Sequence, residues 1–109
     1  MNPAVQHATN QMVERNNAHI VANNHSGMDQ EYVEQQKWAI SEGRRYLKGT
    51  AGGSVSIFID KNTGEIFKPA TYAMPAKGVR GNVLSDQNGD EALDFVNNMM
   101  LVFVRYARG

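Results

Sequence analysis

The chain has no cysteine, only three histidines and only three prolines in 109 residues. The absence of cysteine excludes disulfide bonds, thiolate metal ligands and a cysteine nucleophile. His7, His19 and His25 are spread along the polar N-terminal third, with no carboxylate at ligand spacing. The sequence therefore predicts neither a metal site nor any other bound cofactor.

An excess of charge of one sign is also missing, because 11 basic residues balance 11 acidic ones. Domains that bind nucleic acids strongly usually carry an excess of Lys and Arg, so a nucleic-acid site in this chain has to be a local patch. No apolar run approaches the roughly 18 residues that a membrane-spanning helix needs. The N-terminus also lacks the charged-then-apolar pattern of a signal peptide. We therefore expect a soluble, cytoplasmic protein with no membrane partner.

The first element that the sequence predicts is a helix. Asn2 and Pro3 suit the cap and the first position of a helix. The apolar residues that follow recur at helical spacing, which predicts a helix over about residues 3–22. After a loop, Asp29 is expected to cap a short second helix that reaches Gln36.

The apolar period changes after this helical part. Residues 37–48 are expected to form a strand bent by a bulge at Gly43, where glycine lets an extra residue fit. A single helix over residues 29–48 is the competing interpretation, because Ile40 and Leu47 also fit a helical face.

The clearest element is a hairpin. Val55, Ile57 and Ile59 alternate with other residues as in a half-buried strand. A return strand is expected over residues 65–69, and Gly64 is placed for a positive-φ bulge in the connection.

The last third of the chain predicts two more strands, over residues 79–84 and 99–105, with a short helix capped by Asp90 between them. The second of these strands contains the apolar run of residues 99–104. We expect it either to be buried on both faces of the sheet or to pair with a neighbouring subunit.

Together these elements predict an α+β fold, mainly β, in a single domain of residues 1–109. A helical segment over about residues 3–36 precedes a β part over about residues 37–109. Short antiparallel strands bent at glycines favour a strongly bent sheet or a small closed barrel. The five expected strands cover residues 37–48, 54–60, 65–69, 79–84 and 99–105.

The candidate functional residues centre on the basic, glycine-punctuated segment of residues 77–84. Arg80 stands between Gly78 and Gly81, and a guanidinium held at such a bend presents donors to a phosphate, a carboxylate or a base edge. Asn82 can read a polar edge or close the turn. A hairpin turn with solvated cations is the structural alternative. The residues considered for nucleic-acid binding are Arg80, Gly81, Asn82, Lys77, Lys68 and Tyr72.

Several motifs between residues 43 and 84 resemble a family of small uncharacterised phage and marine-virus proteins. They are Gly-Arg-Arg-Tyr at 43–46, Phe-Ile-Asp-Lys-Asn-Thr-Gly at 58–64, Lys-Pro-Ala at 68–70 and Pro-Ala-Lys-Gly-Val-Arg-Gly-Asn at 75–82. That family has no established activity. The resemblance therefore implies a viral origin, and with it the cytoplasm of a host cell, rather than a function.

The expected architecture, a helix followed by five bent strands, is similar to that of the Sm and LSm RNA-binding proteins. Residues 79–83 resemble their second signature, in which Arg-Gly and a small polar residue lie between aliphatic residues. In that family the arginine contacts an RNA base and the glycine permits a tight loop. The resemblance places these roles on Arg80 and Gly81. The family's first signature has no clear match, since Asp60 and Asn62 lie in a turn after a strand.

Two functional hypotheses follow. The first is an Sm-like RNA- or single-strand-binding module that forms a homo-oligomer, with aromatic residues that stack on bases. The second is a non-catalytic viral accessory or structural protein that acts through protein–protein contacts, which the neutral charge and the Asn/Gln-rich helix fit equally well. No nucleophile–base pair, phosphate loop or metal spacing stands out, so we do not expect an enzyme.

Overall fold

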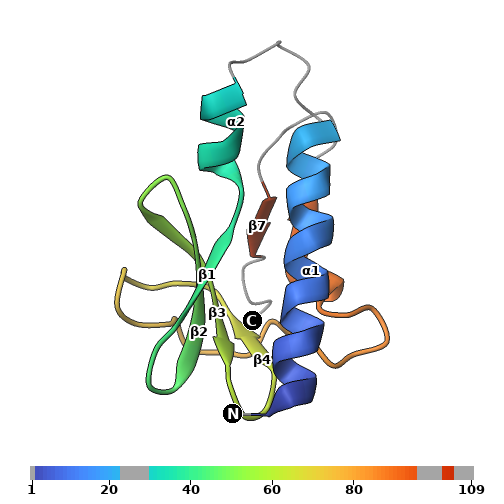
Figure 1. Cartoon of the computed structure of the whole chain (residues 1–109). Helices are drawn as coiled ribbons and strands as arrows, with labels where there is room; N and C mark the ends of the chain where they lie inside the picture. The colour runs from blue at the N-terminus through green and yellow to red at the C-terminus, as the bar shows by residue number, and fades with distance from the viewer. Residues whose placement is uncertain (1, 23–29, 96–101, 105–109) are drawn as a thin grey trace.

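The computed structural model describes residues 2–22, 30–95 and 102–104. This part of the chain forms two α-helices, a five-stranded antiparallel sheet and a separate two-stranded sheet. Figure 1 shows α1 running along one side of the five-stranded sheet, with α2 leading into its first strand. The elements in chain order are α1 (Pro3–Ala22), α2 (Gln30–Gln36), β1 (Ala39–Glu42), β2 (Tyr46–Ala51), β3 (Ser54–Asp60), β4 (Glu65–Phe67), β5 (Gly81–Asn82), a 3₁₀ turn η1 (Asp90–Ala92), β6 (Leu93–Phe95) and β7 (Val102–Val104).

The first helix lies where the sequence predicts it, over residues 3–22. The Asn2 side chain caps it, because Asn2 Oδ1 accepts a hydrogen bond from the Ala4 N–H at 2.9 Å. The apolar stripe of α1 is a packing face, since Val5 and Met12 are fully buried in the main core cluster.

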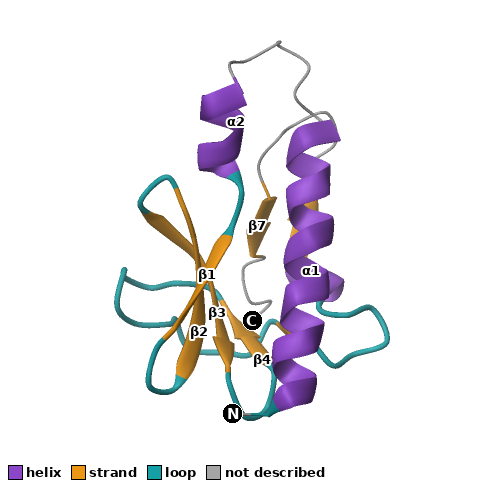
Figure 2. Cartoon of the chain, in the orientation of Figure 1, coloured by secondary structure: helices purple, strands orange, loops and turns teal. Residues whose placement is uncertain are grey.

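The five-stranded sheet follows the chain from one strand to the next. Its order is β1-β2-β3-β4-β5, and each neighbouring pair is antiparallel. The prediction of a mainly β α+β fold with an N-terminal helix is confirmed. The sheet is open, however, because within the described residues β1 and β5 are its outer strands and do not pair with each other. The alternative of a closed barrel is therefore wrong for this part of the chain. Figure 2 shows the strands in orange beside the purple helix α1.

The prediction of one bent strand over residues 37–48 is wrong. This stretch forms two strands, β1 and β2, which reverse through Gly43, Arg44 and Arg45. The Gly43 N–H donates to the Tyr46 carbonyl at 2.9 Å and closes that turn. These three residues offer no apolar side chain to bury, so the chain turns there instead of bulging. The register shift lies further on, between Gly49 and Thr50.

The competing helix over residues 29–48 is also wrong, because α2 ends at Gln36. The chain becomes extended from Trp38 onward, and the side chain of Asn17 on α1 holds it there. The Trp38 N–H donates to Asn17 Oδ1 at 2.8 Å, and Asn17 Nδ2 donates to the Trp38 carbonyl at 3.2 Å. The Asn17 amide thus bonds the backbone of Trp38 as a neighbouring strand would.

The hairpin of β3 and β4 is confirmed. Phe58 pairs with Phe67 and Ile59 with Ile66, and the return strand ends at Phe67, two residues before its predicted end. Gly64 has a φ of +82°, and a Cβ at that position would lie 2.6 Å from an Asn82 side-chain oxygen. Both observations require glycine at the turn.

The last third of the chain departs most from the prediction. The strand expected over residues 79–84 is reduced to the two residues of β5. Within the strand expected over residues 99–105, Val102–Val104 form β7, which pairs with β6 in a separate sheet and not with the five-stranded one. Residues 99–101 and 105 lie outside the described part.

The helix expected after Asp90 is also wrong, since a single 3₁₀ turn leads directly into β6. The Asp90 carboxylate does not cap a helix, because it forms an ion pair with Arg15 on α1 at 2.8 Å. The chain becomes extended at Leu93, which is buried with Val104 in the main core cluster. Burial of these two side chains against the rest of the core favours the strand pair over a helix.

Candidate functional site

The loop around Arg80 is closed by its own polar groups. Arg80 Nη1 donates to the carbonyls of Lys77 and Gly78 at 3.0 and 2.8 Å. The Arg80 backbone N–H donates to the Ile66 carbonyl at 2.7 Å, which holds the loop against β4. In this conformation the guanidinium stabilises the turn that carries it.

Glu91 holds the chain that follows Arg80. Its carboxylate accepts hydrogen bonds from the Asn82 N–H at 2.9 Å and from the Ser85 hydroxyl at 2.7 Å. A Cβ on Gly81 would lie only 2.8 Å from Glu91 Oε2, so glycine lets the carboxylate approach the backbone. Burial raises the pKa of Glu91, but these hydrogen bonds outweigh it and leave the pKa below its usual value.

The Asn82 side chain completes the turn. Asn82 Nδ2 donates to the Thr63 carbonyl at 2.9 Å, and Asn82 Oδ1 accepts from the Leu84 N–H at 2.8 Å. Gly81 and Asn82 therefore have a structural role in the turn. The sequence analysis gave such a turn as the alternative to nucleic-acid binding. A role for Arg80 in recognition stays a prediction.

The other three candidate residues lie in different surroundings. Lys77 is exposed in the loop before Arg80. Lys68 is half-buried, lines a cavity beside Trp38 and donates from Nζ to the Val104 carbonyl at 3.2 Å. Tyr72 lies in the loop between β4 and β5 and remains 61% exposed. The six residues therefore do not form one continuous site.

Tyr72 belongs instead to a cluster on the face of the sheet that points away from α1. On this side the strand register aligns Lys48, Phe58 and Phe67 directly across β2, β3 and β4. The loop that carries Tyr72 lies on the same side, opposite α1 (gold in Figure 1). We call the cluster of Tyr46, Lys48, Phe58, Phe67 and Tyr72 the aromatic face.

The rings of the aromatic face pack edge to face. The Tyr46 ring lies 5.7 Å from that of Phe58 and 6.0 Å from that of Phe67, with interplanar angles of 77° and 81°. Such pairs stabilise by about 0.5–1.5 kcal/mol beyond the area they bury. Phe58 is only 2% exposed, although it is absent from the main core cluster on the other side of the sheet. Aromatic packing therefore gives the outer face a small hydrophobic cluster of its own.

Cations lie directly on these rings. The Lys48 ammonium is 4.1 Å from the centroid of Tyr72 and 5.6 Å from that of Phe58. The Arg45 guanidinium is 5.2 Å from the centroid of Tyr46. These distances fall within the range in which a cation is attracted to the π-face of a ring. Aromatic surface and positive charge thus occupy the same place.

A concave surface adjoins the aromatic face, with a volume of about 450 Å³. It is formed by β1, β2 and the turn between them, together with Phe58 of β3 and the Tyr72 loop. The residues that line it are Ser41, Glu42, Gly43, Arg44, Arg45, Tyr46, Lys48, Phe58 and Ala73.

The acids near this concavity are held by other groups. Glu42 forms an ion pair with Lys61 at 2.8 Å, and Asp60 lies 3.5 Å from Arg45. Burial raises the pKa of Asp60, but hydrogen bonds from the N–H groups of Asn62 and Thr63, together with Arg45, lower it below its usual value. Each of the two acids therefore lies beside a cation of its own, Lys61 for Glu42 and Arg45 for Asp60.

The sequence contained a signal for the aromatic face that our reading of it missed. Tyr46 and Lys48 flank buried Leu47, and Phe58 lies between buried Ile57 and Ile59. Because side chains alternate along a strand, Tyr46, Lys48 and Phe58 lie on the face opposite the core. A search for aromatic and basic residues on the second face of the strands predicted over residues 37–48, 54–60 and 65–69 would have found all of the cluster except Tyr72.

Other kinds of site find no support in the described part of the chain. Residues 2–22, 30–95 and 102–104 contain no group of three or more His, Asp or Glu side chains placed to hold a metal ion. None of the helices within these ranges has the length and apolar character that a membrane span requires.

The comparisons with known proteins add one match. A model for a family of unknown function, DUF7717, matches residues 1–98. No curated protein and no solved structure matches the chain.

Proposed function

The chain belongs to the DUF7717 family of unknown function, and from the surface of its sheet we propose that it binds single-stranded nucleic acid, RNA in the first instance, through the aromatic face. The observation that carries this proposal is the position of Lys48, whose ammonium lies against the rings of both Tyr72 and Phe58. Tyr72 keeps 61% of its surface exposed. A base that stacks on this ring thus meets an aromatic plane with positive charge beside it.

Stacking accounts for binding to bases without a fixed sequence. An unpaired base gains about 1–3 kcal/mol from stacking on an aromatic side chain, and every base offers a π-face for this contact. Tyr72 provides the exposed ring, while half-buried Tyr46 presents a second one beside the concavity. Two rings on one face suit a strand whose bases are splayed out.

The cations beside the rings account for the backbone contacts. Arg44 and Arg45 are exposed at the turn between β1 and β2, and both line the same concavity as Lys48. A guanidinium binds a phosphate through two parallel N–H donors. The zero net charge of the chain is compatible with this arrangement, because three cations gathered in one place form the local patch that binding requires.

Fluorescence anisotropy with labelled ten-residue oligo-U and oligo-A tests the proposal. We expect saturable binding that weakens with salt, with a log–log slope of about −2 if the three cations each displace a counterion. Tyr72→Ala should weaken binding about tenfold, which corresponds to the loss of one stacked base. Met74→Ala is the matched control, because Met74 is 63% exposed in the same loop but carries no ring.

Absence of saturable binding by the folded wild-type protein would overturn the proposal. Equal losses in the Tyr72→Ala and Met74→Ala variants would show that the loop, and not the ring, is responsible. Light scattering on the same samples gives the oligomeric state, so a ring of Sm type is tested together with binding. If neither RNA nor single-stranded DNA binds, a protein partner on the same face becomes the leading alternative.

A further inference from the structure

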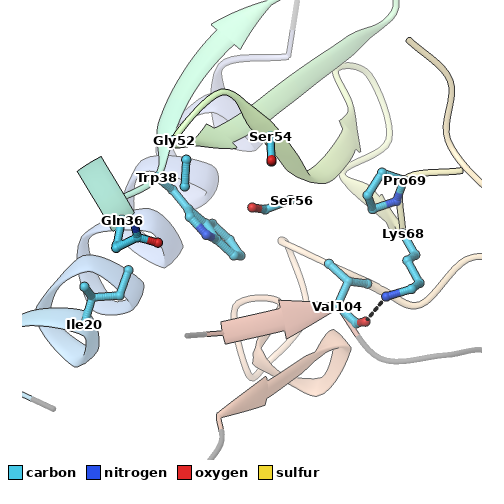
Figure 3. Close-up of a pocket in the computed structure, with 10 residues that line it drawn as sticks. Ile20, Gln36, Trp38, Gly52, Ser54, Ser56, Lys68, Pro69 and Val104 are labelled. Carbon is cyan, nitrogen blue, oxygen red and sulfur yellow. Dashed lines mark hydrogen bonds between the residues drawn. The ribbon is translucent and has the colours of Figure 1, made fainter. Parts of the chain in front are cut away.

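A second cavity lies on the other side of the fold, apart from the aromatic face. It has a volume of about 310 Å³ and is formed by α1, α2, the hairpin of β2 and β3, the residues after β4, and β7. None of the described residues that line it lines the concavity beside Arg45. Figure 3 shows Trp38 on one side of this cavity and Lys68 on the opposite side, with Ser54 and Ser56 of β3 between them.

The Trp38 side of the cavity is mainly apolar, and its backbone is fixed in place. Trp38 is only 5% exposed, and Asn17 bonds both its N–H and its carbonyl. Ile20 is a second apolar residue on this side, and Gln36 adds an amide there (Figure 3). The bonds from Asn17 fix the position of Trp38, which reduces the ordering cost when a ligand packs beside it.

The opposite side is polar and positively charged. Lys68 contributes an ammonium, which its 3.2 Å contact to the Val104 carbonyl keeps at the edge of the cavity. Ser54 and Ser56 contribute hydroxyl groups. Among the described residues that line the cavity there is no carboxylate, and Lys68 is the only charged group.

We propose that this cavity binds a small organic acid with an aromatic ring, which packs its ring on Trp38 and directs its carboxylate to Lys68 and the two serines. A volume of about 310 Å³ is at the lower end of the range for ligand pockets, so the ligand is small. The Lys68 ammonium and the two serine hydroxyls are donors from which a carboxylate can accept hydrogen bonds. The proposal is independent of nucleic-acid binding, because it uses other residues on another surface.

Tryptophan fluorescence tests this directly, since Trp38 is the single tryptophan of the chain. The probe is 3-phenylpropionate, and its neutral isostere 3-phenylpropanamide is the control ligand. We expect 3-phenylpropionate to change the emission saturably and the amide to bind at least about tenfold more weakly, as for the loss of a charge-assisted hydrogen bond. Equal affinity for the two ligands, or no saturable response to the acid, would overturn the proposal.

Variants at lysines inside and outside the cavity test whether the Lys68 charge, and not a change in folding, accounts for binding of the acid. Lys68→Met keeps most of the aliphatic stem and should reduce affinity for the acid about tenfold, while Lys77→Met, an exposed lysine outside the cavity, should not change it. If Lys68→Met does not fold, Ser54→Asp serves instead, because Ser54 is exposed at the rim. The added charge should weaken binding of the acid much more than binding of the neutral amide. Retained affinity for the acid in a folded variant would contradict the proposal.

Discussion

The loop of residues 77–82 and the aromatic face both place cations on the five-stranded sheet, but they use them differently. In the loop, the Arg80 guanidinium donates to two carbonyls of its own turn. On the aromatic face, the Lys48 ammonium lies against two rings, and the Arg45 side chain is 70% exposed. An arginine between glycines can thus serve its own turn, whereas the Lys48 ammonium lies on a ring that is exposed at the surface, where we propose that the ligand binds.

Among the changes that test this difference, substitution of Glu91 should have the largest effect on stability. Glu91→Ala removes the acceptor of two hydrogen bonds, one from the Asn82 N–H and one from the Ser85 hydroxyl. Loss of charge-assisted bonds in a half-buried turn should lower the free energy of unfolding by about 2–3 kcal/mol. Urea denaturation measures this, with Glu14→Ala on the exposed side of α1 as the control. A change no larger than that of the control would mean that the loop is not held as described.

A smaller effect is expected from pH. Hydrogen bonds keep the folded-state pKa of Glu91 below its ordinary value of 4.5, so the unfolded chain takes up the proton first as the pH falls. Its contribution to stability is therefore full above about pH 4.5 and is lost as the pH falls through the folded-state pKa. Asp60 acts in the same direction below its ordinary value of 3.8.

Thermal melts of the wild type between pH 6 and pH 3 should accordingly show a falling Tm below about pH 4.5. Glu91→Gln cannot titrate, so its Tm should fall less steeply over the same interval. Parallel profiles for the two proteins would contradict a role for the Glu91 carboxylate in the acid-sensitive stability.

The smallest effect is expected when Arg80→Ala is tested for RNA affinity. Because the guanidinium closes its own turn, this variant should lose about 1 kcal/mol of stability for its hydrogen bonds. Its affinity for oligo-U should remain within about twofold of the wild type, in contrast to the loss expected for Tyr72→Ala. A tenfold loss in a folded Arg80→Ala protein would move the binding site to the loop, where the Sm-like resemblance places it.

The elements that the sequence predicted well are those whose apolar pattern is local. The helix over residues 3–22 and the hairpin closed by Gly64 each have a clear period and a recognisable end. The turn at Gly43 was missed because a glycine between two extended runs fits a bulge as well as a reversal. Only the pairing of β1 with β2 distinguishes them, and pairing depends on contacts distant in sequence.

The end of the chain and the surroundings of the candidate site were hard to predict for related reasons. The sequence predicts a helix after Asp90, because a short apolar run fits a helix as well as a strand. The pairing of β6 with β7 makes this segment a strand. The sequence makes Arg80, Gly81 and Asn82 candidates for nucleic-acid binding, with a turn as the structural alternative, but it does not show that Glu91 holds this turn. The aromatic face depends on the register across three strands, which no single segment contains.

The most direct test of the central claim is an NMR titration of the ¹⁵N-labelled protein with oligo-U, which locates the contact without any substitution. If nucleic acid binds on the aromatic face, the largest amide shifts should occur at Tyr46, Lys48, Phe58 and the Tyr72 loop, and residues 77–82 should shift little. Shifts centred on residues 77–82, with the aromatic face unchanged, would contradict the account.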